Sequence, residues 1–81
     1  MDQAVLDKLV ADALDIAVGE NGYDNLKEMA SSEIAVDLLE HDDGIYKYLF
    51  SIKPVHELEE VLGYIEKSVT KYRVEHVWQI L

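Results

Sequence analysis

Apolar side chains recur at intervals of three and four residues along two long stretches of this 81-residue chain, and this is the spacing of one helix face. The first stretch covers residues 3–18. Asp2 precedes it as a helix N-cap, and Gly19 follows it at the position where many helices end in left-handed backbone. The pattern therefore predicts a helix over 3–18, with an apolar face comprising Val5, Leu6, Leu9, Val10, Ala13, Leu14, Ile16 and Ala17.

The second long stretch runs from Pro54, a residue suited to the first turn of a helix, to Tyr72. A shorter helix is predicted over residues 33–41, with Ser31 or Ser32 as its cap. The predicted buried arc of the long helix comprises Leu58, Val61, Leu62, Ile65, Val69 and Tyr72.

Two further segments, 45–52 and 73–81, fit a helix or a strand equally well. If both were strands, the second half of the chain would be a β-α-β unit. Two parallel strands rarely form a stable sheet by themselves. We therefore predict an all-α fold, a small bundle of three to five helices, with an α+β fold carrying a C-terminal β-α-β unit as the alternative. The length predicts a single domain over 1–81.

The chain has no cysteine, which excludes disulfides and thiolate zinc sites. A chain of this size therefore has to draw its stability from helix packing or self-association. It contains no run of about 20 apolar residues, the length that spans a bilayer. Its first residues are acidic where a signal peptide would be basic. We expect a soluble, cytoplasmic protein.

The net charge of −10 comes entirely from the first half of the chain. Residues 1–43 hold twelve acidic residues and two lysines, whereas residues 44–81 hold five acidic and five basic residues. Such a surface repels nucleic acid and anionic membranes and attracts basic proteins. The expected partner is therefore a basic protein.

Acidic side chains about one helical turn apart lie roughly 5–6 Å from each other. DNA presents one phosphate per about 3.4 Å of axis on each strand, so a rigid row of carboxylates can occupy a groove built for phosphates. We predict a non-enzymatic inhibitor of a nucleic-acid-binding protein or nuclease. In the alternative interpretation, the acidic residues only keep the protein soluble. The predicted contacts are Asp7, Asp12, Asp15, Asp37, Glu40, Asp42 and Asp43.

A second hypothesis concerns the apolar C-terminal segment, which contains the single tryptophan. Tryptophan in an exposed apolar patch is typical of an interface, so the chain could be a homodimeric adaptor or regulatory protein. Alternatively, Trp78 folds back to complete the core. The predicted dimer interface comprises Val74, Val77, Trp78 and Leu81.

No catalytic, metal or nucleotide motif is present. The segment 56–60 resembles the start of a zinc-protease helix, but Glu60 stands where the second histidine is needed. The segment 40–44 lacks the alternating ligand spacing of a calcium loop. There is no Gly-x-Ser-x-Gly elbow, and the four glycines are scattered. We therefore predict no enzymatic activity, no metal and no cofactor.

The segments Tyr23-Asp24-Asn25-Leu26-Lys27-Glu28-Met29 and Ser31-Ser32-Glu33-Ile34-Ala35-Val36-Asp37-Leu38 resemble a stretch of small helical phage-encoded proteins of unassigned role. Acidic phage proteins of this size include inhibitors of host defence, of the anti-CRISPR and anti-restriction kinds. Toxin immunity proteins are also acidic inhibitors. The resemblance implies an inhibitory binding protein, and it carries no site residues.

Overall fold

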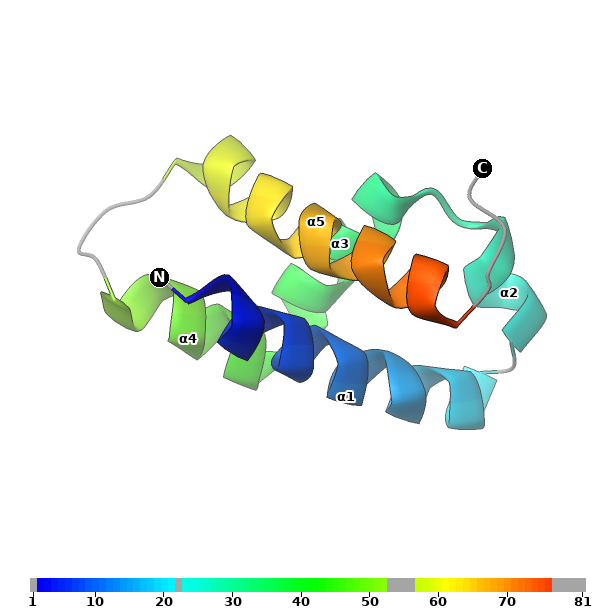
Figure 1. Ribbon diagram of the computed structural model, residues 1–81. Coiled ribbons are helices and arrows are strands. Elements are labelled where there is room, and N and C mark those ends of the chain that lie inside the picture. Colours follow the sequence, from blue (N-terminus) through cyan, green and yellow to red (C-terminus); the bar gives the residue numbers. More distant parts are fainter. Residues whose placement is uncertain (1, 22, 53–56, 77–81) are drawn as a thin grey trace.

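The computed structural model describes residues 2–21, 23–52 and 57–76, which form helices joined by short connections (Figure 1). The predicted all-α bundle is confirmed, and no strand occurs in these ranges. None of the described helices combines the length and the apolar character needed to cross a membrane. The helices are α1 (Gln3–Asn21), α2 (Tyr23–Glu28), α3 (Ser31–His41), α4 (Asp43–Ile52) and α5 (Leu58–Glu75).

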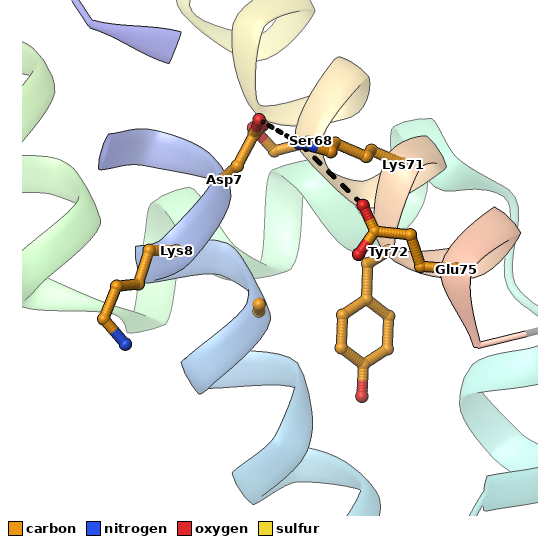
Figure 2. A pocket seen from close by; sticks show the side chains of 7 residues that line it. Asp7, Lys8, Ser68, Lys71, Tyr72 and Glu75 are labelled. Carbon is orange, nitrogen blue, oxygen red and sulfur yellow. Dashed lines mark hydrogen bonds and ion pairs between the residues drawn. The ribbon is translucent and has the colours of Figure 1, made fainter. Parts of the chain in front are cut away.

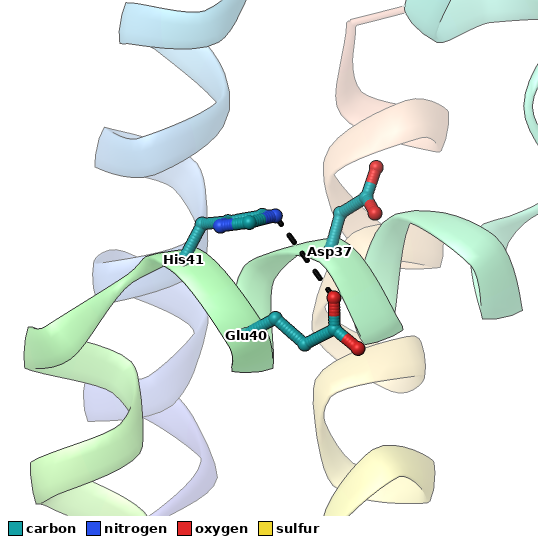
Figure 3. Close-up of side chains that lie close together, drawn as sticks. All are labelled: Asp37, Glu40 and His41. Carbon is teal, nitrogen blue, oxygen red and sulfur yellow. Dashed lines mark ion pairs between the residues drawn. The ribbon is translucent and has the colours of Figure 1, made fainter.

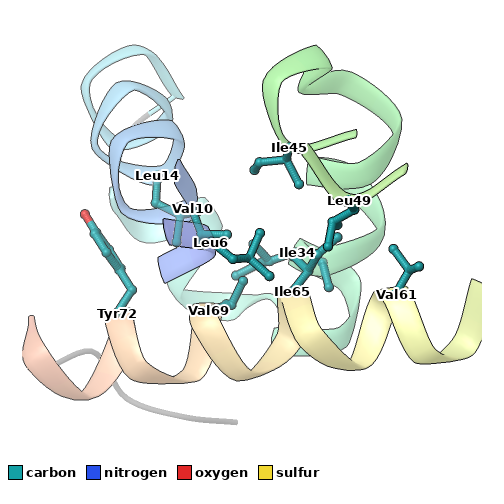
Figure 4. Close-up of a cluster of buried hydrophobic side chains, with 11 residues drawn as sticks. Leu6, Val10, Leu14, Ile34, Ile45, Leu49, Val61, Ile65, Val69 and Tyr72 are labelled. Carbon is teal, nitrogen blue, oxygen red and sulfur yellow. The ribbon is translucent and has the colours of Figure 1, made fainter. Parts of the chain in front are cut away.

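Helix α5 lies at the centre of the bundle and packs along both α1 and α3, while α4 packs against the same two helices. Each of these four helices contributes apolar side chains to one core (Figure 4). Because α5 contacts both partners along its length, it contributes the largest share of buried apolar residues. The core comprises Leu6, Val10 and Leu14 from α1, Ile34 and Ala35 from α3, Ile45 and Leu49 from α4, and Val61, Ile65, Val69 and Tyr72 from α5.

The ambiguous segment 45–52 lies within α4, so the strand alternative is wrong for it. Ile45 and Leu49, one helical turn apart, are both buried. A strand would place Lys47 on the same face as these two, but Lys47 is exposed. The side chain of Asp42 caps this helix, because its Oδ1 accepts a hydrogen bond of 2.9 Å from the backbone N–H of Ile45. In the second ambiguous segment, α5 continues to Glu75, and residues 77–81 lie outside the described residues.

Several predicted helix ends were wrong. Helix α1 continues past Gly19 to Asn21, and α5 begins at Leu58. Pro54, the predicted start of α5, lies outside the described residues. The N-cap of α3 is Ala30 rather than a serine, and Glu33 Oε1 accepts a hydrogen bond of 3.4 Å from the Ala30 backbone N–H. The predicted cap Asp2 is confirmed, since its Oδ1 accepts a hydrogen bond of 2.9 Å from the Ala4 backbone N–H.

The buried face of α1 lies within the predicted arc, at the edge nearest Asp7, where Leu6, Val10 and Leu14 are buried. Val5 and Ile16, at the far edge of that arc, are exposed. Leu58 was predicted to be buried in the long helix and is also exposed. Helical periodicity identifies an apolar arc, but the helices that pack against it decide which part of the arc is covered.

Arg73 is the largest fully buried side chain, and it joins α5 to the connection between α2 and α3. Its guanidinium donates hydrogen bonds to the carbonyl oxygens of Leu26 and Lys27, each at 3.3 Å, and to that of Met29. It also donates one of 2.9 Å to Ser31 Oγ, the hydroxyl that the sequence predicted as a helix cap. Carbonyl groups at a helix C-terminus lack intrahelical hydrogen-bond donors. The Arg73 guanidinium donates to two such carbonyls at the end of α2.

Candidate functional site

Asp7, one of the predicted partner contacts, is turned toward α5 in a pocket of about 190 Å³ between α1 and α5 (Figure 2). Its carboxylate accepts hydrogen bonds from the Ser68 hydroxyl at 2.6 Å and from the Lys71 ammonium at 3.1 Å. Gln3 Nε2 donates to Ser68 Oγ at 2.8 Å and to the Tyr64 carbonyl at 3.1 Å. The Asp7 side chain is only 19% exposed, so it joins two helices of the protein and is largely shielded from any partner.

The environment of Asp7 keeps its carboxyl ionised. Burial by itself raises the pKa of Asp7, but the hydrogen bonds from Ser68, Lys71 and Gln3 and the charge of Lys71 together bring that pKa below its ordinary value of 3.8. The hydrogen bond and charge of Asp7, followed by the charge of Glu75, raise the pKa of Lys71. The two groups therefore form a stable ion pair.

The same chemistry bears on whether this pocket could catalyse a reaction. A serine nucleophile needs a base with a pKa near the working pH to accept its proton. The only base that the Ser68 hydroxyl contacts in the described residues is Asp7, whose lowered pKa makes it a weak base. Lys71 stays protonated and cannot take that role. The contacts of Asp7 with Ser68 and Lys71 therefore hold α1 against α5, and we call them the interhelical lock.

The other two predicted partner contacts on α1, Asp12 and Asp15, are exposed, but each already interacts with a side chain of this protein. Asp12 forms an ion pair of 3.3 Å with Lys8, one turn away. Asp15 Oδ1 accepts a hydrogen bond of 2.6 Å from the hydroxyl of Tyr72, whose ring stacks on that of His76 with centroids 3.8 Å apart. The predicted acidic row on α1 is therefore divided: Asp12 is in an ion pair, Asp15 accepts a hydrogen bond, and Asp7 is partly buried against α5.

The junction of α3 and α4 presents a group of exposed carboxylates that form no ion pair with a lysine or arginine of the described residues. Asp37, Glu40 and Asp43 are exposed, and no lysine or arginine in the described part of the chain forms an ion pair with them. Within the described residues, their one contact with a basic side chain is between Glu40 Oε2 and His41 Nε2, at 3.9 Å (Figure 3). Asp42 differs from these three because its side chain caps α4.

Asp37, Glu40 and His41 are the described residues that could hold a metal, since one ligand atom of each lies within 4.8 Å of the others. All three side chains are exposed, and Figure 3 shows them on one outward turn of α3. Resident metal sites usually fix a histidine through a hydrogen bond to its second ring nitrogen. No such bond is present for His41 among the described residues. The group is therefore best described as exposed surface residues. We call the exposed carboxylates Asp37, Glu40 and Asp43 the acidic surface.

An apolar groove of about 540 Å³ lies beside this acidic surface, between α3, α4 and α5. We call it the α3–α4–α5 groove. Helical periodicity did not predict it, because three helices from separate parts of the chain have to assemble before its walls exist. It is lined by Val36, Leu39, Tyr46, Leu58 and Leu62, together with the acidic residues Glu40 and Asp43.

Of the predicted dimer interface, only Val74 lies in the described residues. Its side chain is 63% exposed at the end of α5. Val77, Trp78 and Leu81 lie outside the described residues, so the interface stays a prediction.

Comparison of the chain with protein-family models, curated proteins and solved structures gave no match, so the acidic surface and the α3–α4–α5 groove are defined by geometry alone.

Proposed function

We propose that this protein is a non-enzymatic binding protein that occupies the basic surface of a nucleic-acid-binding protein or nuclease. The observation that carries the proposal is the group of exposed carboxylates Asp37, Glu40 and Asp43, which no lysine or arginine of the described chain balances. Unbalanced carboxylates on a chain of net charge −10 generate a negative field that attracts a cationic partner. Inhibition follows if the partner needs the same cationic surface for nucleic acid.

The positions of these carboxylates are held by the core. Helix α3 is anchored by the buried side chains of Ile34 and Ala35, and α4 by those of Ile45 and Leu49. The helical backbone that carries these charges is already ordered, so only the freedom of the side chains is lost when a partner binds, which favours affinity. Phosphate groups along a nucleic-acid backbone are similarly fixed in spacing, and this supports mimicry of nucleic acid.

Fewer than the seven predicted acidic residues are available for contact with a partner. Asp7 belongs to the interhelical lock, and Asp42 is a helix cap. Asp12 is balanced by Lys8, which leaves Asp15 as the contributor from α1. A protein that competes for basic nucleic-acid-binding surfaces would suit a phage that has to disable a host defence nuclease.

The experiment compares the wild-type chain with the variant Asp37→Asn/Glu40→Gln/Asp43→Asn. The immobilised wild-type chain is used to isolate basic proteins from the source cell at low salt, and each isolated protein is tested for competition with duplex DNA or RNA. We expect the triple variant to lose competition at least about tenfold, and wild-type affinity to fall steeply with salt.

The matched control is Glu28→Gln/Glu59→Gln/Glu66→Gln, which removes the same charge from exposed positions elsewhere. This control should retain most of the competition. If both triple variants compete equally, net charge alone accounts for binding and the assigned surface is wrong. If the wild type competes with no nucleic acid for any isolated protein, the proposed function is wrong.

A further inference from the structure

We propose that the α3–α4–α5 groove binds the apolar face of a basic amphipathic helix supplied by the partner, an inference that rests on the proposed function. The groove and the acidic surface are continuous, because Glu40 and Asp43 belong to both. A single partner segment can therefore contact apolar and acidic groups together. Helices that bind in grooves insert one apolar face and keep their polar residues at the rim.

Exposed apolar side chains are concentrated at this groove. Six large hydrophobic residues are exposed in the described chain, and three of them line the groove: Leu58 at 59%, Tyr46 at 50% and Val36 at 39%. Exposed hydrophobic residues scattered singly need no explanation, but a contiguous group with a polar rim is typical of an interaction site. A volume of about 540 Å³ accommodates several apolar side chains of a partner.

Charge complementarity determines which occupant fits. The rim residues Glu40 and Asp43 are acidic, and the nearby Asp37 adds a third negative charge. Lysine or arginine side chains flanking the apolar face of a helix would lie against this rim. Such pairs increase the association rate and reject acidic competitors.

A second copy of this chain is a poorer occupant. In a symmetric dimer through the groove, Glu40 and Asp43 of both copies would approach one another, and each copy carries a net charge of −10. Like charges brought together in this way oppose association. The groove therefore selects a basic partner segment over self-association.

The test uses a designed Leu/Lys peptide whose leucines recur at the i, i+3, i+4 and i+7 positions of one helix face. A peptide of the same composition, with its leucines distributed around the helix, is the control ligand. We expect the amphipathic peptide to bind more tightly in fluorescence anisotropy. Amide chemical shifts should change mainly along α3, α4 and the start of α5.

Two double variants test whether the peptide binds at the groove or at any exposed apolar side chain. Tyr46→Ser/Leu58→Ser should weaken peptide binding about 25-fold or more, since each truncated anchor side chain typically costs at least a factor of about five. Ile16→Ser/Val74→Ser removes two equally exposed apolar side chains elsewhere and should change affinity less than about twofold. All four positions are exposed, so circular dichroism should show unchanged helicity.

In the peptide-binding and sedimentation experiments, any of three results would overturn the inference: equal binding of both peptides, equal losses in the two pairs of variants, or a wild-type dimer that Tyr46→Ser/Leu58→Ser dissociates. The last result would assign the groove to a second copy. The proposed function is tested separately by competition with nucleic acid. If Tyr46→Ser/Leu58→Ser still competes like the wild type, the groove inference fails while the function stands.

Discussion

The hydroxyl of Ser68 on α5 donates a hydrogen bond of 2.6 Å to the carboxylate of Asp7 on α1, 61 residues earlier in the chain. Ser68 is buried, and Lys71 supports the same carboxylate from the next turn of α5. A carboxylate that the sequence places among exposed acids therefore joins the two longest helices. The contacts of Asp7, Arg73 and Asp42 therefore each make a contribution to stability that can be measured.

Replacing Asp7 with alanine should lower the free energy of unfolding by about 1–3 kcal/mol, because Ser68 and Gln3 would each lose a hydrogen-bond acceptor in a partly buried site. Urea titration monitored by circular dichroism measures the change. Asp37→Ala, an exposed acid with no such contacts, is the control and should shift stability by less than about 0.5 kcal/mol. Equal losses in both variants would contradict the lock.

The contribution of Asp7 should depend on pH with a defined sign. The pKa of Asp7 is lower in the folded protein than its ordinary value of 3.8, so the unfolded chain binds its proton first as the pH falls. The stabilisation is complete above that ordinary value and is lost as the pH falls through the folded-state pKa.

We therefore expect the difference in unfolding free energy between wild type and Asp7→Asn to be constant near neutral pH and to shrink below about pH 4. Urea titrations of both proteins at several pH values test this. Ser68→Ala removes one hydrogen bond that lowers the folded-state pKa of Asp7, so in that background the decrease should be smaller and should be complete at a higher pH. A difference that grows as the pH falls would contradict the assignment.

Arg73→Lys should destabilise the protein by roughly 2–3 kcal/mol although the charge is retained. A lysine ammonium cannot reproduce the planar fork that contacts Ser31 and the carbonyls of Leu26, Lys27 and Met29. Hydrogen exchange should show the largest loss of protection at α2 and the start of α3. Lys71→Arg, which exchanges the same residue types at an exposed site, is the control. If both variants are equally stable, the fork geometry is unimportant.

Asp42→Ala should cost about 1 kcal/mol because it removes the cap of α4, whereas Asp42→Asn should be nearly neutral because asparagine caps as well as aspartate. Thermal unfolding distinguishes the two. A large loss in Asp42→Asn would mean that the charge of Asp42, and not its cap hydrogen bond, stabilises the junction.

Local patterns in the sequence were sufficient to predict the helices. The spacing of Leu6, Val10 and Leu14, like that of Val61, Ile65 and Val69, is a property of adjacent turns and requires no knowledge of partners. The cap at Asp2 is equally local, because its acceptor and the N–H it binds are two residues apart. For this reason, the sequence alone indicated an all-α fold. The concentration of acidic residues in the first half is likewise visible in the sequence without any structure.

The tertiary structure decided which side chains remain available to a partner. Asp7 meets Ser68 and Arg73 meets Ser31 across large separations in sequence, and nothing in the local pattern specifies those encounters. The α3–α4–α5 groove likewise exists only once three helices pack together. The physical reason is that propensity, capping and periodicity act within a few residues, whereas burial and charge pairing depend on which surfaces the packed helices bring into contact.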